Sequence, residues 1–235
     1  MSGAAIPRKQ SPSLVEGFAL FADLSASERA TIVSAAREKV FSRGETLFLE
    51  GEPIRQNILL LSGCAKVTQI GISGAEVILR LNGPGELVGA FGFCGRCEHC
   101  TSAQAIQSST AIVWEGACFD TILERFPTFR RNTNRALEER LAELEQRFRE
   151  ISTEKVGARV SSQLIRLSNQ VGRLVDGKVE IGVSRANLAQ LTGTTLFTVS
   201  RLLCQWKSLG IVSPRREAVI LRDVAALKQL ALGDE

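Results

Sequence analysis

The sequence predicts an α+β protein, in which an antiparallel roll of short strands precedes a long helix and a small helical domain with a β-hairpin. Two observations support this prediction. From about residue 40 to residue 114, short apolar runs alternate with glycines, as is typical of antiparallel sandwiches and rolls. After residue 127 the apolar residues take helical spacing, which indicates helices. We therefore expect domains over residues 1–126, 127–155 and 156–235.

The composition is that of a globular protein that can bury a core. Of its 235 residues, 44% are hydrophobic and 23% are charged. No apolar run approaches the roughly 20 residues that a membrane helix needs, and the first residues contain no stretch typical of a signal peptide. We therefore expect a cytoplasmic protein without membrane contact, whose six cysteines are packing residues, metal ligands or redox groups before they are structural disulfides.

Positive charge is concentrated in the C-terminal third. Residues 155–235 contain twelve Lys or Arg against six Asp or Glu, whereas the first 154 residues contain seventeen against nineteen. A basic domain on a slightly acidic body suggests an anionic partner, of which nucleic acid is the commonest. A solvated basic face is the alternative.

In the N-terminal part, a helix is expected over residues 25–39, with Ser25 as its N-cap and Glu28 completing a capping box. The strands of the roll are expected in the runs ETLFL, NILLL, AKVTQI, EVILRL and AIVW. Glycines between these runs supply the positive φ angles of tight hairpins.

The long helix has a narrow apolar stripe. Its members follow one another at spacings of 4, 3, 4 and 3 residues, which is the a/d pattern of a heptad repeat; they are Leu137, Leu141, Leu144, Phe148 and Ile151. Charged residues flank the stripe. We interpret it as the interface of a parallel dimer; the alternative is a helix that lies on its own sheet.

The C-terminal pattern predicts a winged helix-turn-helix. A helix over residues 156–170 is followed by loop and strand over 172–183, and then by two short helices on either side of Gly193. Two helices joined by a short turn that contains glycine form the helix-turn-helix motif. The segment 211–223 is expected to add a β-hairpin with a basic tip.

Five segments in this order resemble the CRP/FNR family of transcription regulators: RGETLFLEGEP (43–53), LLLSGCAKV (59–67), GPGELVGAFG (83–92), STEKVGAR (152–159) and SRANLAQLTGTTLFTVSRLL (184–203). The resemblance covers residues 18–225. It implies a cyclic-nucleotide-binding-type β-roll (jelly roll) as the sensory domain, a dimerisation helix and a winged helix-turn-helix DNA-binding domain.

The resemblance also implies a function. The protein would bind a palindromic site in double-stranded promoter DNA as a homodimer, in response to a redox, gas or small-molecule signal. RNA polymerase would be a further partner if the protein is an activator. Residues 150–157 would form the hinge between the domains. The rival hypotheses are a β-roll sensor that acts without DNA and a regulator that responds to a cyclic nucleotide.

The resemblance places the DNA contacts on the helix that begins near Thr195. Ser200 and Arg201 match a pair that contacts bases in the family, and an arginine can bind guanine O6 and N7 together. Phe197 stands where the family usually has a glutamate, so the half-site is expected to differ from the common consensus. The candidate DNA contacts, including phosphate contacts, are Ser184, Arg185, Thr195, Phe197, Thr198, Ser200, Arg201, Lys207, Arg215 and Arg216.

A cyclic nucleotide fits this sequence poorly. In relatives that bind one, a glutamate meets the ribose and an arginine meets the cyclic phosphate. Here Ala90 takes the glutamate position, and the arginine position falls near Thr101. A buried phosphate without a cation is costly, so cyclic AMP is not expected. Two features keep it open: the hydroxyls of Ser152 and Thr153 at positions that meet the base, and Arg80 on a strand nearby.

A cysteine cluster takes the place of the phosphate loop. The spacing of Cys94, Cys97 and Cys100 lets one loop present three thiolates to an iron–sulfur cluster, with Cys118, Cys64 or His99 as the fourth ligand. The oxygen-sensing relatives take most of their cluster cysteines from an N-terminal segment, whereas residues 1–40 contain none here. Zinc held by three thiolates and His99, haem, a reversible disulfide and simple packing remain open.

Catalysis is not expected. The chain has one histidine and neither a nucleophile elbow nor a phosphate-binding loop. Cys204, on the second helix of the motif, is interpreted as a packing residue.

Overall fold

The computed structural model describes residues 12–72, 74–89 and 98–232. These residues form two compact units. The first holds the chain up to Gln69 together with Leu81–Arg140, and the second holds Ile70–Arg80 together with Leu141 and the rest of the chain. The long helix and the strand β5 therefore contribute to both units.

The predicted N-terminal helix is shorter than expected. After the 3-10 turns η1 (Pro12–Val15) and η2 (Ala19–Phe21), α1 spans Ala26–Ser34, and Ser25 and Glu28 form the predicted capping box. The prediction of helix up to residue 39 is wrong, because Arg37–Phe41 is strand β1 and pairs with β8. The side chain of Phe41 is completely buried in the apolar cluster of the roll.

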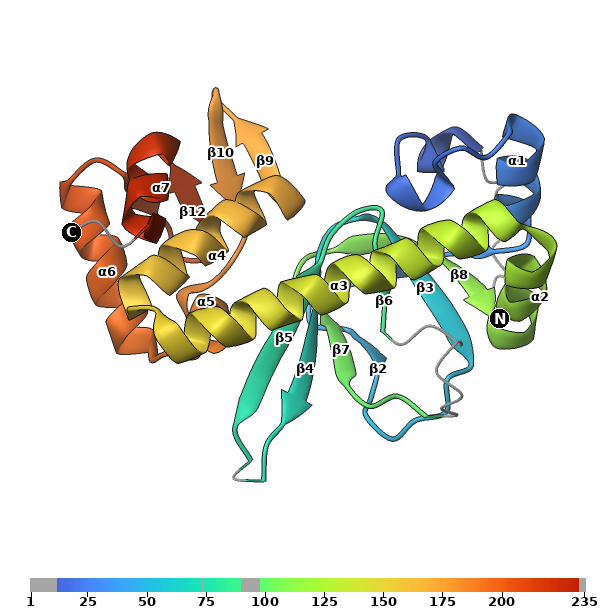
Figure 1. Ribbon diagram of the computed structural model, residues 1–235, viewed down its shortest axis with the longest axis horizontal. Coiled ribbons are helices and arrows are strands. Elements are labelled where there is room, and N and C mark those ends of the chain that lie inside the picture. Colours follow the sequence, from blue (N-terminus) through green and yellow to red (C-terminus); the bar gives the residue numbers. More distant parts are fainter. Residues whose placement is uncertain (1–11, 73, 90–97, 233–235) are drawn as a thin grey trace, which may run out of the picture. The chain divides into compact units, whose positions relative to one another are not determined.

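Two antiparallel sheets form the predicted β-roll (Figure 1), which belongs to the first unit except for Ile70 and the first five residues of β5. One sheet has the order β1-β8-β3-β6, with β8 at Ser109–Glu115, β3 at Gln56–Ser62 and β6 at Leu87–Val88. The other has the order β2-β7-β4-β5, with β2 at Thr46–Phe48, β7 at Ser102–Ala105, β4 at Ala65–Ile70 and β5 at Glu76–Asn82. One buried cluster joins side chains of both sheets, among them Phe41, Phe48, Val67 and Val113.

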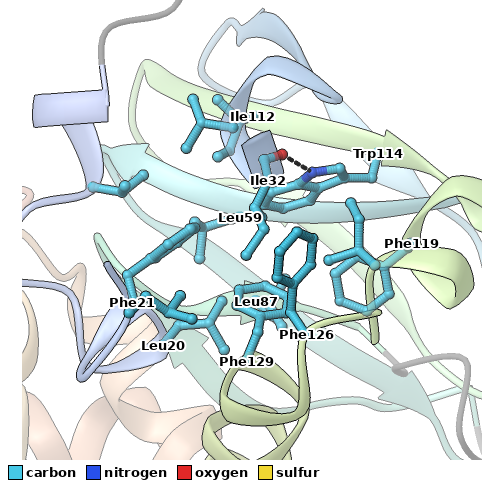
Figure 2. Packing of buried hydrophobic residues seen from close by; sticks show 14 of the residues in the cluster. Leu20, Phe21, Ile32, Leu59, Leu87, Ile112, Trp114, Phe119, Phe126 and Phe129 are labelled. Atoms are coloured by element: carbon cyan, nitrogen blue, oxygen red, sulfur yellow. Dashed lines mark hydrogen bonds between the residues drawn. The ribbon is translucent and has the colours of Figure 1, made fainter. Parts of the chain in front are cut away.

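A second apolar cluster fixes the helices to the roll (Figure 2). Trp114 of β8 is fully buried and donates a hydrogen bond of 2.9 Å from its indole Nε1 to the carbonyl of Ile32 in α1. Phe119 of α2 (Gly116–Arg125) and Phe129 of the next helix pack around it, with ring centroids 5.5 and 6.4 Å from that of Trp114.

The long helix α3 spans Pro127–Thr153. The chain leaves helical geometry at Glu154 and Lys155 and then forms α4 over Val156–Gln170, which has the predicted limits. Gly157 of the expected hinge is therefore in the first turn of α4. The division of the chain into the three predicted domains stays a prediction.

The C-terminal part is a winged helix-turn-helix, as predicted. After β9 (Gly172–Val175) and β10 (Lys178–Ile181), it contains α5 (Arg185–Thr192), α6 (Leu196–Ser208), β11 (Val212–Pro214) and β12 (Val219–Leu221). The four strands form one sheet with the order β11-β12-β10-β9. A final helix, α7 (Val224–Leu232), was not predicted. None of the helices in the described ranges is both long and apolar enough to cross a lipid bilayer.

Candidate nucleic-acid interface

Local capping sets the geometry of the helix-turn-helix. The Ser184 hydroxyl accepts a hydrogen bond from the Asn187 N–H at 3.1 Å, which confirms it as the cap of α5. Thr195 caps α6 in the same way, through the Thr198 N–H at 3.1 Å. Between the helices, Gly193 has a φ of +60°, a left-handed conformation that glycine adopts without steric cost. The predicted start of the second helix near Thr195 is thus confirmed.

Packing of α6 determines which of its residues can meet a partner. Val199, Leu203 and Trp206 are at most 2% exposed, and their spacing of 4 and 3 places them on one side of the helix. Phe197 and Arg201, four residues apart, are exposed on the other side, whereas Thr198 and Ser200 are half-buried. Because the buried side is already filled, Cys204 is exposed, and the interpretation of Cys204 as a packing residue is wrong.

The candidate cations differ in their surroundings. Arg201, Lys207 and Arg216 are exposed, so each can reach a ligand without first leaving the interior. Arg215 pairs with Glu180 of β10 at 2.9 Å and would have to exchange this carboxylate for a phosphate. Arg185 is half-buried, and its Nε atom has no partner among the described residues.

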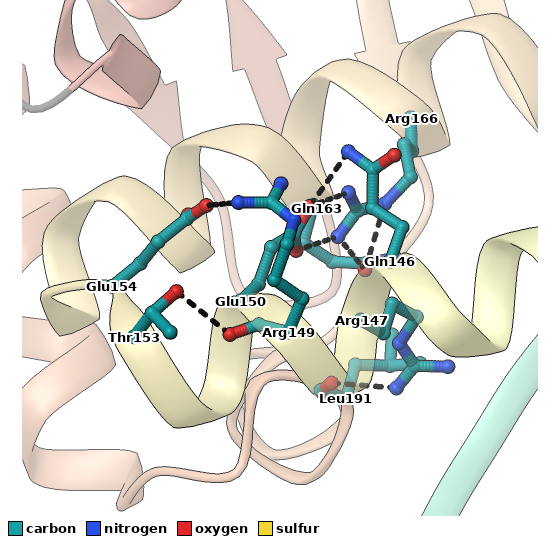
Figure 3. Close-up of polar contacts among 9 residues, drawn as sticks. All are labelled: Gln146, Arg147, Arg149, Glu150, Thr153, Glu154, Gln163, Arg166 and Leu191. Carbon is teal, nitrogen blue, oxygen red and sulfur yellow. Dashed lines mark hydrogen bonds and ion pairs between the residues drawn. The ribbon is translucent and has the colours of Figure 1, made fainter.

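A polar network, which sequence reasoning missed, holds the helix-turn-helix on α3 (Figure 3). Arg147 is 8% exposed and donates to the carbonyl of Leu191, in the last turn of α5, at 2.7 Å. It also donates to the carbonyls of Ile78 and Leu79 in β5. Burial lowers the pKa of Arg147, but a guanidinium stays charged at neutral pH. Arg147 therefore links the motif to two further elements of the second unit.

An ion pair joins α3 to α4 beside this arginine. Glu150 is 3% exposed, and its two carboxylate oxygens accept hydrogen bonds of 2.7 and 2.8 Å from Arg166. Burial alone would raise the pKa of Glu150, but the hydrogen bonds and charge of Arg166 outweigh it, with help from Gln146 and Arg149, and the pKa is lowered. Gln163 completes the network by accepting from Arg166 at 3.0 Å.

The predicted dimer stripe divides into two parts. Leu137 is half-buried and packs against the apolar cluster around Trp114. The other four side chains are exposed by 45–75%: Leu141, Leu144, Phe148 and Ile151. A row of large apolar side chains at heptad spacing is what a second helix would cover.

The structure describes some of the cysteines that are candidate metal ligands. Cys94 and Cys97, like Ala90, lie outside the described residues. Cys100 is exposed, Cys64 is fully buried in the turn before β4, and Cys118 is half-buried on α2. Among the residues with described positions, no three His, Cys, Asp or Glu side chains gather as a metal site. The metal ligands therefore remain a prediction.

His99 lies in a pocket of the β-roll. It is 6% exposed and stacks on Phe48, with ring centroids 3.8 Å apart and an interplanar angle of 8°. Burial lowers the pKa of His99, and the carboxylate of Glu52 partly offsets this. Its Nδ1 atom is buried and has no partner in the described part of the chain. The pocket has a volume of about 170 Å³, and Leu47, Arg55 and Ile58 also line it.

Hydroxyl groups occupy several positions that bear on the cyclic-nucleotide hypothesis. At the start of β7, where the resemblance places the phosphate-binding arginine, Thr101 and Ser102 carry hydroxyls, and the Ser102 hydroxyl accepts from the Glu50 N–H at 3.0 Å. The hydroxyls of Ser152 and Thr153 donate to carbonyls of their own helix, at 2.8 and 2.9 Å.

Known proteins share both parts of this architecture. The family model of a cyclic nucleotide-binding domain matches residues 38–126, and that of a Crp-like helix-turn-helix domain matches residues 158–230. The cyclic AMP receptor protein of Thermus thermophilus is 27% identical over 220 residues, which are 93% of this chain and 99% of the relative. An anaerobic regulatory protein of Pasteurella multocida is 24% identical over 197 residues, 83% of this chain and 72% of the relative.

Solved structures agree on the fold. FixK2 from Bradyrhizobium japonicum superposes with a TM-score of 0.73 at 21% identity, over 83% of this chain and 96% of that one. A CRP/FNR-family transcriptional regulator from Thermus thermophilus superposes with a TM-score of 0.70 at 22% identity, over 83% of this chain and 98% of that one.

Proposed function

Because the chain belongs to the CRP/FNR family of transcription regulators and contains its DNA-binding domain, we propose that it reads a near-palindromic promoter site as a homodimer in the cytoplasm. The exposed side of α6 is the observation that supports this proposal most directly. It presents Phe197 and Arg201 on a helix whose opposite side is fully packed, so the helix can enter a major groove without rearrangement.

The contacts divide into two classes. Arg201 is the base reader, since its exposed guanidinium can bind guanine O6 and N7 and discriminate by about 1–3 kcal/mol. Thr198 and Ser200 are half-buried, and because they are two residues apart they lie on opposite edges of the helix, on either side of the exposed face that carries Arg201. The remaining candidates position the protein on phosphates without reading sequence; they are Ser184, Arg185, Thr195, Lys207, Arg215 and Arg216.

Dimerisation places two such helices on one duplex. In the proposal, Leu141, Leu144, Phe148 and Ile151 pack against the same residues of a second copy. Their exposure in the single chain supports this. Two recognition helices related by a two-fold axis then meet half-sites about one helical turn, or roughly 34 Å, apart. RNA polymerase is the further partner if the protein activates transcription.

The β-roll senses the signal in this proposal. The described residues supply no cation for a cyclic phosphate at the start of β7, so a redox, gas or small-molecule signal is favoured over cyclic AMP. His99 and Cys100 are the candidate ligands with described positions in the cysteine-rich segment 93–100, where an iron–sulfur cluster, zinc, haem or a thiol pair would act. The signal shifts the population of domain arrangements and thereby the presentation of the recognition helices.

Selection from a random duplex library tests the proposal. The wild-type protein should enrich a near-palindromic site, and its affinity should fall steeply with salt, because phosphate contacts release counterions. Arg201→Ala should lose the preference for the enriched site while the protein stays dimeric and folded. A β-roll sensor that acts without DNA would enrich nothing, and an unchanged site preference of Arg201→Ala would refute the assignment of α6.

A further inference from the structure

Two large apolar side chains are exposed where α6 begins. Leu196 is 53% exposed and Phe197 is 78% exposed, and they are the first two residues of the helix after its cap, Thr195. The core of this domain uses Val199, Leu203 and Trp206 of the same helix. Folding therefore does not require an apolar residue at position 196 or 197, and their exposure indicates a contact outside the chain.

Their place on the helix identifies that contact, provided that the proposed function holds. The N-terminal residues of a recognition helix are those that meet base edges in the major groove. Phe197 is one turn before Arg201 and therefore on the same side of the helix. Phe197 and the guanidinium of Arg201 thus face the same stretch of duplex, and Leu196 lies about 100° around the helix from Phe197, at the end of the helix that enters the groove.

The chemistry of the major groove leaves one apolar target. Guanine, cytosine and adenine present hydrogen-bond donors and acceptors there, and only thymine adds a methyl group, at C5. An aromatic ring or isobutyl group packed on a cytosine amino group or a guanine carbonyl would leave that polar atom desolvated and unpaired, which is unfavourable. A thymine methyl group instead gains from burial.

We propose that Leu196 and Phe197 read thymine C5-methyl groups, beside the base that Arg201 reads, in each half-site. The specificity of this protein would then depend on methyl groups, in place of a carboxylate that accepts from the cytosine amino group. The ligand is a 5-methylpyrimidine edge in duplex DNA, and 5-methylcytosine should satisfy the same contact in part.

Deoxyuridine tests this proposal because it differs from thymidine by the methyl group alone. The selected site is synthesised with deoxyuridine at one thymine position at a time. At the contacted thymines, wild-type affinity should fall about fourfold per methyl removed. The penalty should vanish in Phe197→Ala or Leu196→Ala, for the position that each residue contacts. Thymines outside the half-sites, which should show no penalty, are the matched control.

A second variant keeps the test independent of weak binding by the alanine variants. Phe197→Glu should shift the preferred base from thymine to cytosine, since glutamate accepts from cytosine N4. Wild-type protein that binds its site equally well with deoxyuridine at every position would overturn the inference, as would a deoxyuridine penalty that persists unchanged in both alanine variants. Failure of the proposed function is a different result: no duplex would be enriched at all.

Discussion

Glu150→Gln should destabilise the second unit and leave the first one unchanged. The substitution keeps the shape of the side chain but removes the negative charge of the carboxylate, which accepts two hydrogen bonds of 2.7 and 2.8 Å from Arg166. The Glu150 side chain is 4% exposed and that of Arg166 is 24% exposed. Breaking a fully buried pair costs about 3–5 kcal/mol. Because Arg166 stays partly exposed to solvent and hydrogen-bonded to Gln163, we expect the free energy of unfolding to fall by a smaller amount, about 2 kcal/mol.

The two tryptophans allow this to be measured separately in each unit. Trp114 belongs to the first unit and Trp206 to the second, and both are at most 2% exposed. In a Trp114→Phe background, urea unfolding followed by Trp206 fluorescence should show a midpoint lowered by about 1 M. In a Trp206→Phe background, the Trp114 signal should keep its midpoint. The reasoning would be refuted if Glu150→Gln left the urea midpoint of the Trp206 signal unchanged. It would also be refuted if the substitution lowered the midpoints of the Trp206 and Trp114 signals by the same amount.

The stabilisation by the Glu150–Arg166 pair should also depend on pH, in a direction that the pKa shift of Glu150 determines. The pKa of Glu150 in the folded protein lies below its ordinary value of 4.5, so the pair stabilises fully above about pH 4.5. This stabilisation is lost as the pH falls through the lower pKa of the folded state. The difference in stability between wild type and Glu150→Gln should therefore be constant near neutral pH and shrink below about pH 4.5. A difference that grows on acidification would contradict the assigned pair.

Three further substitutions or measurements follow from the same structure. Leu141→Glu should convert the proposed dimer to a monomer, as measured by light scattering, because it places two carboxylates in an apolar interface, whereas Glu145→Gln beside the stripe should not; a Leu141→Glu protein that stays dimeric would exclude the stripe as the interface. Gly193→Ala should lower the free energy of unfolding, followed by Trp206 fluorescence, by about 1 kcal/mol, since an L-residue is strained at its φ of +60°; an unchanged urea midpoint would contradict the turn geometry. Anaerobically purified protein should show broad visible absorbance that weakens in Cys100→Ser if a cluster is bound; colourless, metal-free protein that still regulates would exclude it.

Periodicity and capping predicted most of the fold because both act locally. Ser25, Ser184 and Thr195 are caps whose partners lie three residues away, and such contacts can be inferred from sequence. The end of α1 could not, because the strand character of Arg37–Phe41 depends on pairing with β8, more than sixty residues later. The start of α7 did have a local signal: the Asp223 carboxylate accepts from the Ala226 N–H at 2.8 Å.

The site was predictable where it depends on the face of one helix and not where it depends on contacts between elements. The spacing of the α6 residues indicates which side Phe197 and Arg201 share, and the same spacing, applied to Cys204, should have placed it outside the core. Nothing in the sequence pairs Glu150 with Arg166, or Arg147 with Leu191, because each contact requires α3 to lie beside another element. Arg147 and Arg149 are both charged residues beside a leucine stripe, yet only Arg147 is buried.

The buried contacts of Arg147 constrain how the recognition helix can be repositioned. The carbonyls at the end of α5 are bound to α3 through Arg147 and to α4 through Arg159, which donates to Thr192 at 3.3 Å. The turn that precedes α6 is therefore fixed on both sides. A movement of α5 and α6 away from α3 and α4 would break these bonds and leave the buried guanidinium of Arg147 with only the β5 carbonyls of Ile78 and Leu79 as partners, at a cost of about 1–3 kcal/mol. A movement that carries α4, α5, α6, the second-unit part of α3 and the β5 residues Ile78 and Leu79 together keeps every one of these bonds. A signal that reaches the DNA-binding domain should thus act by turning this assembly as one body.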